Sequence, residues 1–141
     1  EMRVIETEWW ILELPEEWQA EQDEETIIIT DDDAVGEIAI TTLKKDGDLV
    51  DDAELKAYAE DIEQQHGAGS AVEVSELQGF YYAYREDDEA IREWYLRCDD
   101  LLVLITYVCD VSNAGMDDSA VDEILSTLYI KLEGEGESEE G

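Results

Sequence analysis

The acidic segment Asp31–Asp33, followed by Gly36, has residue types that could bind calcium. An EF-hand loop takes oxygen ligands from positions 1, 3, 5 and 12 and has glycine at position 6. Counted from Asp31, Val35 stands at position 5 and Thr42 at position 12, where an oxygen ligand and a bidentate glutamate are required. We therefore interpret this segment as an acidic surface turn. The acids within Asp110–Asp118 also lack the spacing of a ligand set.

His66 is the only histidine and so the first candidate for acid–base catalysis. It is expected at the end of a helix, where it can interact with the terminal carbonyl groups, and we favour that structural role. One histidine without a nearby cysteine pair does not match the usual zinc frameworks. The chain contains no nucleophile-elbow serine, Walker A loop or dinucleotide fingerprint. We expect a non-enzymatic protein with no catalytic, cofactor-binding or metal-binding residues.

A group of aromatic residues could be read as a platform for stacking nucleic-acid bases: Phe80, Tyr81, Tyr82, Tyr84, Trp94 and Tyr95. Such platforms need basic residues among the aromatic ones. Here only Arg85, Arg92 and Arg97 are nearby, amid many acids. The sequence favours packing in the core and on the surface of a sheet.

The two cysteines, Cys98 and Cys109, are not expected to form a disulfide. Each ends a predicted strand, and a two-residue turn at Asp99–Asp100 would place Cys98 beside Leu101. Cys109 lies eight positions beyond Leu101, which at about 3.4 Å per residue separates the cysteines by roughly 27 Å. Buried free thiols are the better interpretation, and they suit a reducing cytoplasm.

The net charge is −33, from 41 Asp and Glu residues against 8 Lys and Arg residues. Most carboxylates cannot find a cationic partner, so the surface is tolerable mainly where salt screens it or where an acidic face is wanted. Nucleic acids and anionic membranes should be repelled, and neither is expected as a partner. The acids occur along the whole chain, which favours general adaptation to salt over a single acidic face.

Apolar periodicity and turn residues predict seven strands and two helices. The expected strands are Thr7–Leu14, Thr26–Thr30, Gly36–Leu43, Ala71–Leu77, Gly79–Arg85, Ala90–Cys98 and Leu101–Cys109. The expected helices run from Asp51 to Gly67 and over about Asp118–Ile130.

Each predicted helix has one apolar stripe that should face the sheet. Asp51 and Glu54 have the spacing of a capping box at the start of the first helix. The stripes have i, i+3, i+4, i+7 spacing, and the residues expected to face inward are Leu55, Tyr58, Ile62, Val121, Leu125 and Leu128.

The turn at Asp99–Asp100 also sets which residues share a face in the last hairpin. It aligns Trp94, Leu96 and Cys98 with Val103, Ile105 and Tyr107 on one face, and Tyr95 with Leu102, Leu104 and Val108 on the other. Apolar residues on both faces indicate a pair of strands that is covered on both sides.

These elements predict an α+β fold: an antiparallel sheet of about six or seven strands flanked by two helices in an α/β/α sandwich. Residues 1–132 should form one domain, and residues 133–141, which are only Gly, Glu and Ser, a disordered acidic tail. No apolar run approaches the roughly 20 residues that span a bilayer, and no secretion signal is recognisable, so we expect a soluble cytoplasmic protein.

Several motifs resemble the Mog1/PsbP/DcrB-like superfamily. Leu-Pro-Glu-Glu-Trp at 14–18 resembles its L-P-x-x-W segment, and Gly-Phe-Tyr-Tyr-Ala-Tyr at 79–84 its G-x-x-Y-x-Y strand. Residues 92–107 are similar to the hairpin that follows, and residues 122–128 to the closing helix. The resemblance, to a small uncharacterised prokaryotic member, implies an antiparallel sheet flanked by helices and a role in binding partners. No binding residue of characterised members can be placed on this chain.

The function expected from the sequence is that of a non-enzymatic, acidic protein-interaction domain from a salt-adapted organism, with an unknown protein partner and no cofactor. The alternative is a nucleic-acid mimic that occupies a basic groove on its partner, which would need carboxylates along one face.

Overall fold

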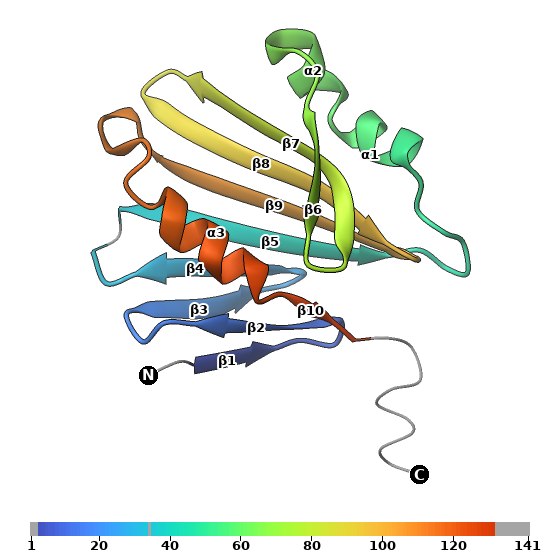
Figure 1. Cartoon of the computed structure of the whole chain (residues 1–141), viewed down its shortest axis with the longest axis horizontal. Coiled ribbons are helices and arrows are strands. Elements are labelled where there is room, and N and C mark those ends of the chain that lie inside the picture. Colours follow the sequence, from blue (N-terminus) through green and yellow to red (C-terminus); the bar gives the residue numbers. More distant parts are fainter. Residues whose placement is uncertain (1–2, 34, 132–141) are drawn as a thin grey trace.

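The computed structural model describes residues 3–33 and 35–131, which form an α+β fold around a seven-stranded antiparallel sheet (Figure 1). Its strand order is β3 (Trp18–Asp23), β4 (Thr26–Asp31), β5 (Gly36–Lys44), β9 (Leu101–Asp110), β8 (Glu89–Cys98), β7 (Leu77–Glu86) and β6 (Ser70–Val74). A second, three-stranded sheet has the order β1 (Arg3–Glu6), β2 (Trp10–Leu14) and β10 (Tyr129–Ile130). The expected fold class and number of strands in the main sheet are confirmed.

The helical elements are α1 (Asp52–Tyr58), α2 (Glu60–His66), the short 3-10 helix η1 (Val111–Asn113) and α3 (Asp118–Ser126). Among the described residues, no helix has both the length and the apolar character needed to cross a membrane. The predicted acidic tail, 133–141, lies outside the described residues.

The hairpin of β8 and β9 is the centre of the main sheet, and its predicted register is confirmed. Cys98 lies opposite Leu101, and Trp94 lies opposite Ile105. Asp99 has a φ of 54°, a left-handed conformation that closes a two-residue turn with the twist of the strands. Side chains two apart therefore share a face along both strands.

One face of the main sheet, here called the inner face, packs against α3 and the small sheet. Trp94, Leu96, Val103 and Ile105 on this face belong to one buried cluster with residues from β2 and α3. Val121 and Leu125 of α3, which were predicted to face inward, are 0% and 2% exposed, and Leu128, just after the helix, is 1% exposed.

The opposite, outer face is covered by α1 and the loop before it. Leu55 of α1, Val50 and Leu102 form a second buried cluster, against which Phe80 and Tyr95 pack. Asp51 caps α1, because its carboxylate accepts a hydrogen bond of 2.9 Å from the amide of Glu54. Helices therefore flank both faces of the sheet, with the small sheet as an additional cover on the inner face.

The first predicted helix is interrupted, and the inward position of Tyr58 was wrong. Ala59, with φ −93° and ψ 10°, separates α1 from α2. Leu55 and Ala59 are fully buried and Ile62 is partly buried, but Tyr58 is 52% exposed. The buried stripe of α1 follows Leu55 and Ala59, which are four residues apart, and passes to one side of Tyr58.

Some strand boundaries also differ from the prediction. Strands β1 and β3 were missed, and the segment 71–77 is divided by a turn in which Ser75 has a φ of 57°. The first predicted strand starts only at Trp10, because the Thr7 hydroxyl accepts hydrogen bonds from the amides of Trp9 and Trp10 in a turn.

The last predicted helix ends at Ser126 and does not continue to Ile130. The Thr127 hydroxyl donates to the carbonyl of Ile124, and β10 then pairs with β2 through Tyr129 and Ile130. The chain thus leaves the helix to complete the small sheet.

Candidate functional site

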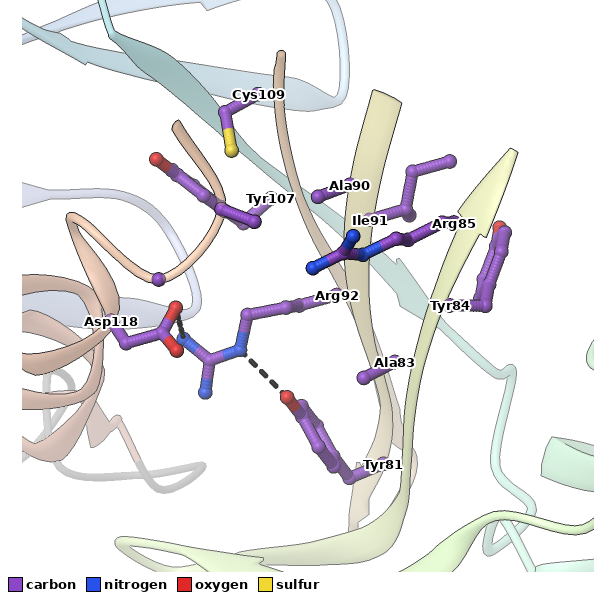
Figure 2. Close-up of a pocket in the computed structure, with 12 residues that line it drawn as sticks. Tyr81, Ala83, Tyr84, Arg85, Ala90, Ile91, Arg92, Tyr107, Cys109 and Asp118 are labelled. Atoms are coloured by element: carbon purple, nitrogen blue, oxygen red, sulfur yellow. Dashed lines mark hydrogen bonds and ion pairs between the residues drawn. The ribbon is translucent and has the colours of Figure 1, made fainter. Parts of the chain in front are cut away.

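A pocket of about 290 Å³ lies on the inner face, between strands β7 to β9 and the segment that leads into α3 (Figure 2). Its lining includes small residues from both sides: Ala83, Ala90, Ala114 and Gly115. Because these residues have short side chains, they leave space where the rest of the inner face is filled by core residues.

Arg92 of β8 forms one wall of this pocket and holds together three elements. Its Nε donates to the hydroxyl of Tyr81 at 2.7 Å, and its Nη2 donates to Oδ1 of Asp122 at 2.8 Å. Its Nη1 lies 3.4 Å from Oδ1 of Asp118, and its guanidinium lies 4.7 Å from the centre of the Trp94 ring. Burial disfavours the charged form of Arg92, but the hydrogen bonds to Tyr81 and Asp122 outweigh burial and raise its pKa.

Tyr107 of β9 forms the deeper wall, beside Cys109. Its hydroxyl donates to Oδ2 of Asp117 at 2.7 Å. Burial and this hydrogen bond raise the pKa of Tyr107 above its ordinary value, so the phenol stays protonated at neutral pH. Its ring occupies the space where a Cβ on Gly36 would lie, so the glycine allows the close approach of β5.

Asp31 and Asp110 belong to the two acidic segments that the sequence raised as possible cation sites. Asp31 ends β4, and its Oδ1 is buried with no hydrogen-bond partner among the described residues. Asp110 caps η1 and accepts hydrogen bonds from the amide and hydroxyl of Ser112, which lower its pKa. Among the described residues, no three His, Cys, Asp or Glu side chains are grouped so that they could hold a metal ion.

The sheet separates the aromatic group into two sets. Tyr81 and Trp94 are on the inner face, with ring centres 5.2 Å apart. Phe80, Tyr82, Tyr84 and Tyr95 alternate with them and lie on the outer face, because neighbouring residues of a strand point to opposite faces. The group therefore does not form one continuous platform.

His66 is the last residue of α2, as expected, and its ring stacks on Tyr84 at a distance of 4.2 Å between ring centres. Nearby, the Tyr82 hydroxyl donates to Glu63 at 2.6 Å, and the hydroxyls of Tyr84 and Tyr95 donate to Glu93. The contacts of His66 and Glu63 attach α2 to the outer face, although α2 has no fully buried residue, whereas the bonds to Glu93 of β8 stay within the sheet.

Cys98 and Cys109 are both free thiols, at opposite ends of the β8–β9 hairpin. Burial is the main cause that raises the pKa of each thiol, so the reactive thiolate is disfavoured at neutral pH. We expect both cysteines to remain reduced, and the melting temperature to be the same with and without reductant. Mass spectrometry of the alkylated protein checks this, and an intramolecular disulfide would contradict the hairpin register.

Comparison with known proteins finds likeness in structure alone. No protein-family model and no curated protein sequence matches the chain. A crystal structure of a protein from Bacteroides thetaiotaomicron is 17% identical, with a TM-score of 0.67 over 90% of this chain. The chain spans 47% of the length of that protein. The two proteins share a fold.

A second match falls within the superfamily that the sequence motifs resemble. The solution structure of the cyanobacterial PsbP protein CyanoP from Synechocystis is 12% identical, with a TM-score of 0.47 over 92% of both chains. At this TM-score no argument about fold or function is drawn from the match.

Proposed function

We propose that this chain is a non-enzymatic protein-binding domain whose acidic surface is an adaptation to high salt. The observation that supports the adaptation is the spread of acids over the fold. Asp87 and Asp88 form the turn at one end of β8, and Asp99 and Asp100 the turn at the other. Acids also lie on the helices that cover opposite faces of the sheet, Asp52 on α1 and Asp122 and Glu123 on α3, whereas a mimic of nucleic acid would concentrate its carboxylates along one face.

The cations of the chain do little to offset this charge at long range. Several of them pair at close distance with individual carboxylates: Lys45 with Glu54 at 2.9 Å, Arg97 with Asp52 at 2.7 Å and Lys131 with Glu6 at 2.6 Å. With 41 acids and 8 Lys and Arg residues, most carboxylates still have no cation to pair with. Mobile salt ions are then the main source of screening.

The support for protein binding is a groove between β6 and α3. Its lining includes Val72 and Val74 of β6, Trp94 of β8 and Leu125 of α3. Strand β6 ends the sheet and pairs only with β7 among the described residues, so one side of its backbone is open. An extended partner segment could add to this edge, and a basic one would complement the net charge of −33.

A synthetic peptide of alternating lysine and valine tests this binding mode. We expect hydrogen-exchange protection of residues 70–74 when the peptide is added, because backbone hydrogen bonds to β6 shield its amides. The matched control is the same peptide with N-methylated amides, which keeps the charges and cannot pair as a strand. Equal effects of the two peptides, or no protection of β6, would contradict the proposal.

A further inference from the structure

Arg85 of β7 lines the same pocket as Arg92, and it lacks a partner. It makes no hydrogen bond or ion pair with the described residues 3–33 and 35–131. Arg85 is exposed to solvent, so its guanidinium is available to a ligand, and it is unpaired although acids outnumber Lys and Arg by 41 to 8. Figure 2 shows its side chain crossing β8 near Ala90, with the guanidinium directed toward Arg92 and Tyr107.

The strand register explains how Arg85 reaches the pocket. Arg85 lies opposite Ala90, whose short side chain leaves room for the arginine to lie across β8. Ala83 lies opposite Arg92, so the two arginines are offset by one pair of residues on the inner face. The orientation brings a second positive charge toward Arg92, and a bound carboxylate at Arg85 would offset this repulsion.

The opposite wall of the pocket is acidic. Asp118 lines it, with its side chain 51% exposed and a long contact of 3.4 Å to Nη1 of Arg92. Arg92 makes its shorter bond to Asp122, so Asp118 retains capacity to accept hydrogen bonds from a ligand. Asp117 beside it already accepts from Tyr107.

A cation on one wall and a carboxylate on the other suit a ligand that carries both charges. A simple anion would be repelled by the net charge of −33, whereas a zwitterion has no net charge to be repelled. Arginine binds carboxylates in a bidentate geometry, and aspartate accepts the N–H donors of an ammonium group.

The size and walls of the pocket restrict the ligand further. Its volume of about 290 Å³ lies at the small end of ligand pockets, which excludes nucleotides and other large molecules. Ala83, Ala90 and Ala114 offer methyl groups to the ligand.

From this geometry we propose that the pocket binds a free aliphatic amino acid, with its carboxylate on Arg85, its ammonium group on Asp118 and its side chain against the alanines. The pocket adjoins the groove beside β6, since Tyr81 and Arg92 line both, but Arg85 and Asp118 line the pocket and not the groove, so the proposal does not depend on binding of a protein at β6.

Calorimetric titration with L-leucine tests the proposal, at a constant ionic strength at which the free protein is folded. We expect saturable binding of L-leucine, and binding at least about tenfold weaker for leucinamide, which lacks the carboxylate, and for 4-methylpentanoate, which lacks the ammonium group. Equal binding of 4-methylpentanoate and L-leucine would overturn the role of Asp118. Absence of saturable binding up to about 50 mM L-leucine would overturn the site.

Substitutions of Arg85 and Arg97 test where on the protein L-leucine binds. Arg85→Ala removes a side chain with no partner among the described residues, so in KCl concentrated enough to screen the change of charge it should leave the melting temperature unchanged and weaken L-leucine binding about tenfold or more. The control is Arg97→Ala, which removes the same charge from β8 but on the outer face, where Arg97 pairs with Asp52. Equal loss in both variants would overturn the proposal, because it would show an effect of net charge alone. Loss of peptide binding at β6 with intact L-leucine binding would contradict only the proposed protein-binding function.

Discussion

The melting temperature of this protein is expected to rise steeply between about 0.01 M and 1 M KCl. Over that range the screening length falls from roughly 30 Å to 3 Å, below typical spacings between surface carboxylates. The repulsion among 41 acidic residues opposes the folded state most strongly in dilute buffer. Thermal melts from millimolar to molar KCl measure the effect, and above 1 M the choice of salt should matter more than its concentration.

Added salt weakens the ion pairs between described residues, an effect on stability opposite to the relief of repulsion, and this makes the test more specific. Salt weakens partly exposed pairs such as Lys45–Glu54 and Arg97–Asp52. A rise in melting temperature therefore shows that relief of repulsion exceeds the loss of these pairs. A flat profile, with full stability in dilute buffer, would contradict salt adaptation and favour the nucleic-acid mimic.

Leu125→Ala is expected to reduce the free energy of unfolding by about 2–5 kcal/mol. Leu125 is 2% exposed and belongs to the buried cluster that joins α3 to the inner face, so its removal leaves a cavity as well as losing apolar burial. Urea unfolding at a fixed, high KCl concentration measures the loss.

The matched control for this variant is Glu123→Ala, on the exposed side of the same helix. It removes one negative charge and should change stability by no more than about 0.5 kcal/mol. A loss below about 1 kcal/mol for Leu125→Ala would show that α3 is peripheral to the core, contrary to its burial.

The centre of the fold could be predicted because two local signals agreed. The alternation of apolar residues in 90–109 and a two-residue turn at Asp99–Asp100 leave a single register for β8 and β9. The buried side of α3 could also be predicted, because Val121 and Leu125 have helical spacing, although the helix ends before Leu128. Strands β1 and β3 gave no such signal, since most of their residues are exposed and polar or charged.

The candidate pocket could not be predicted from the sequence in the same way. Arg92 meets Asp118 and Asp122 across 26 and 30 positions, and no local pattern links these segments. The only available signal was alternation: residues 81, 83 and 85 share a face with 90, 92 and 94, and Ala83 and Ala90 among them leave a gap beside two arginines. Recognising that gap required knowing that α3 begins only at Asp118, at the edge of the pocket, so that the helix does not cover the sheet there.

The small sheet has a consequence for the order in which the chain folds. Tyr129 of β10 pairs with Ile11 of β2, across 118 positions (129 − 11). Closing a loop of this length is entropically unfavourable unless other contacts have already brought its ends together. Strand β2 must therefore keep an open edge until the main sheet and α3 have formed, both during synthesis and during refolding.

Open edges pair readily with those of neighbouring chains, and charged residues there, such as Glu8 beside the strand and Glu13 within it, hinder that pairing by repulsion. The acidity that opposes folding at low salt then also protects the unfinished chain from aggregation.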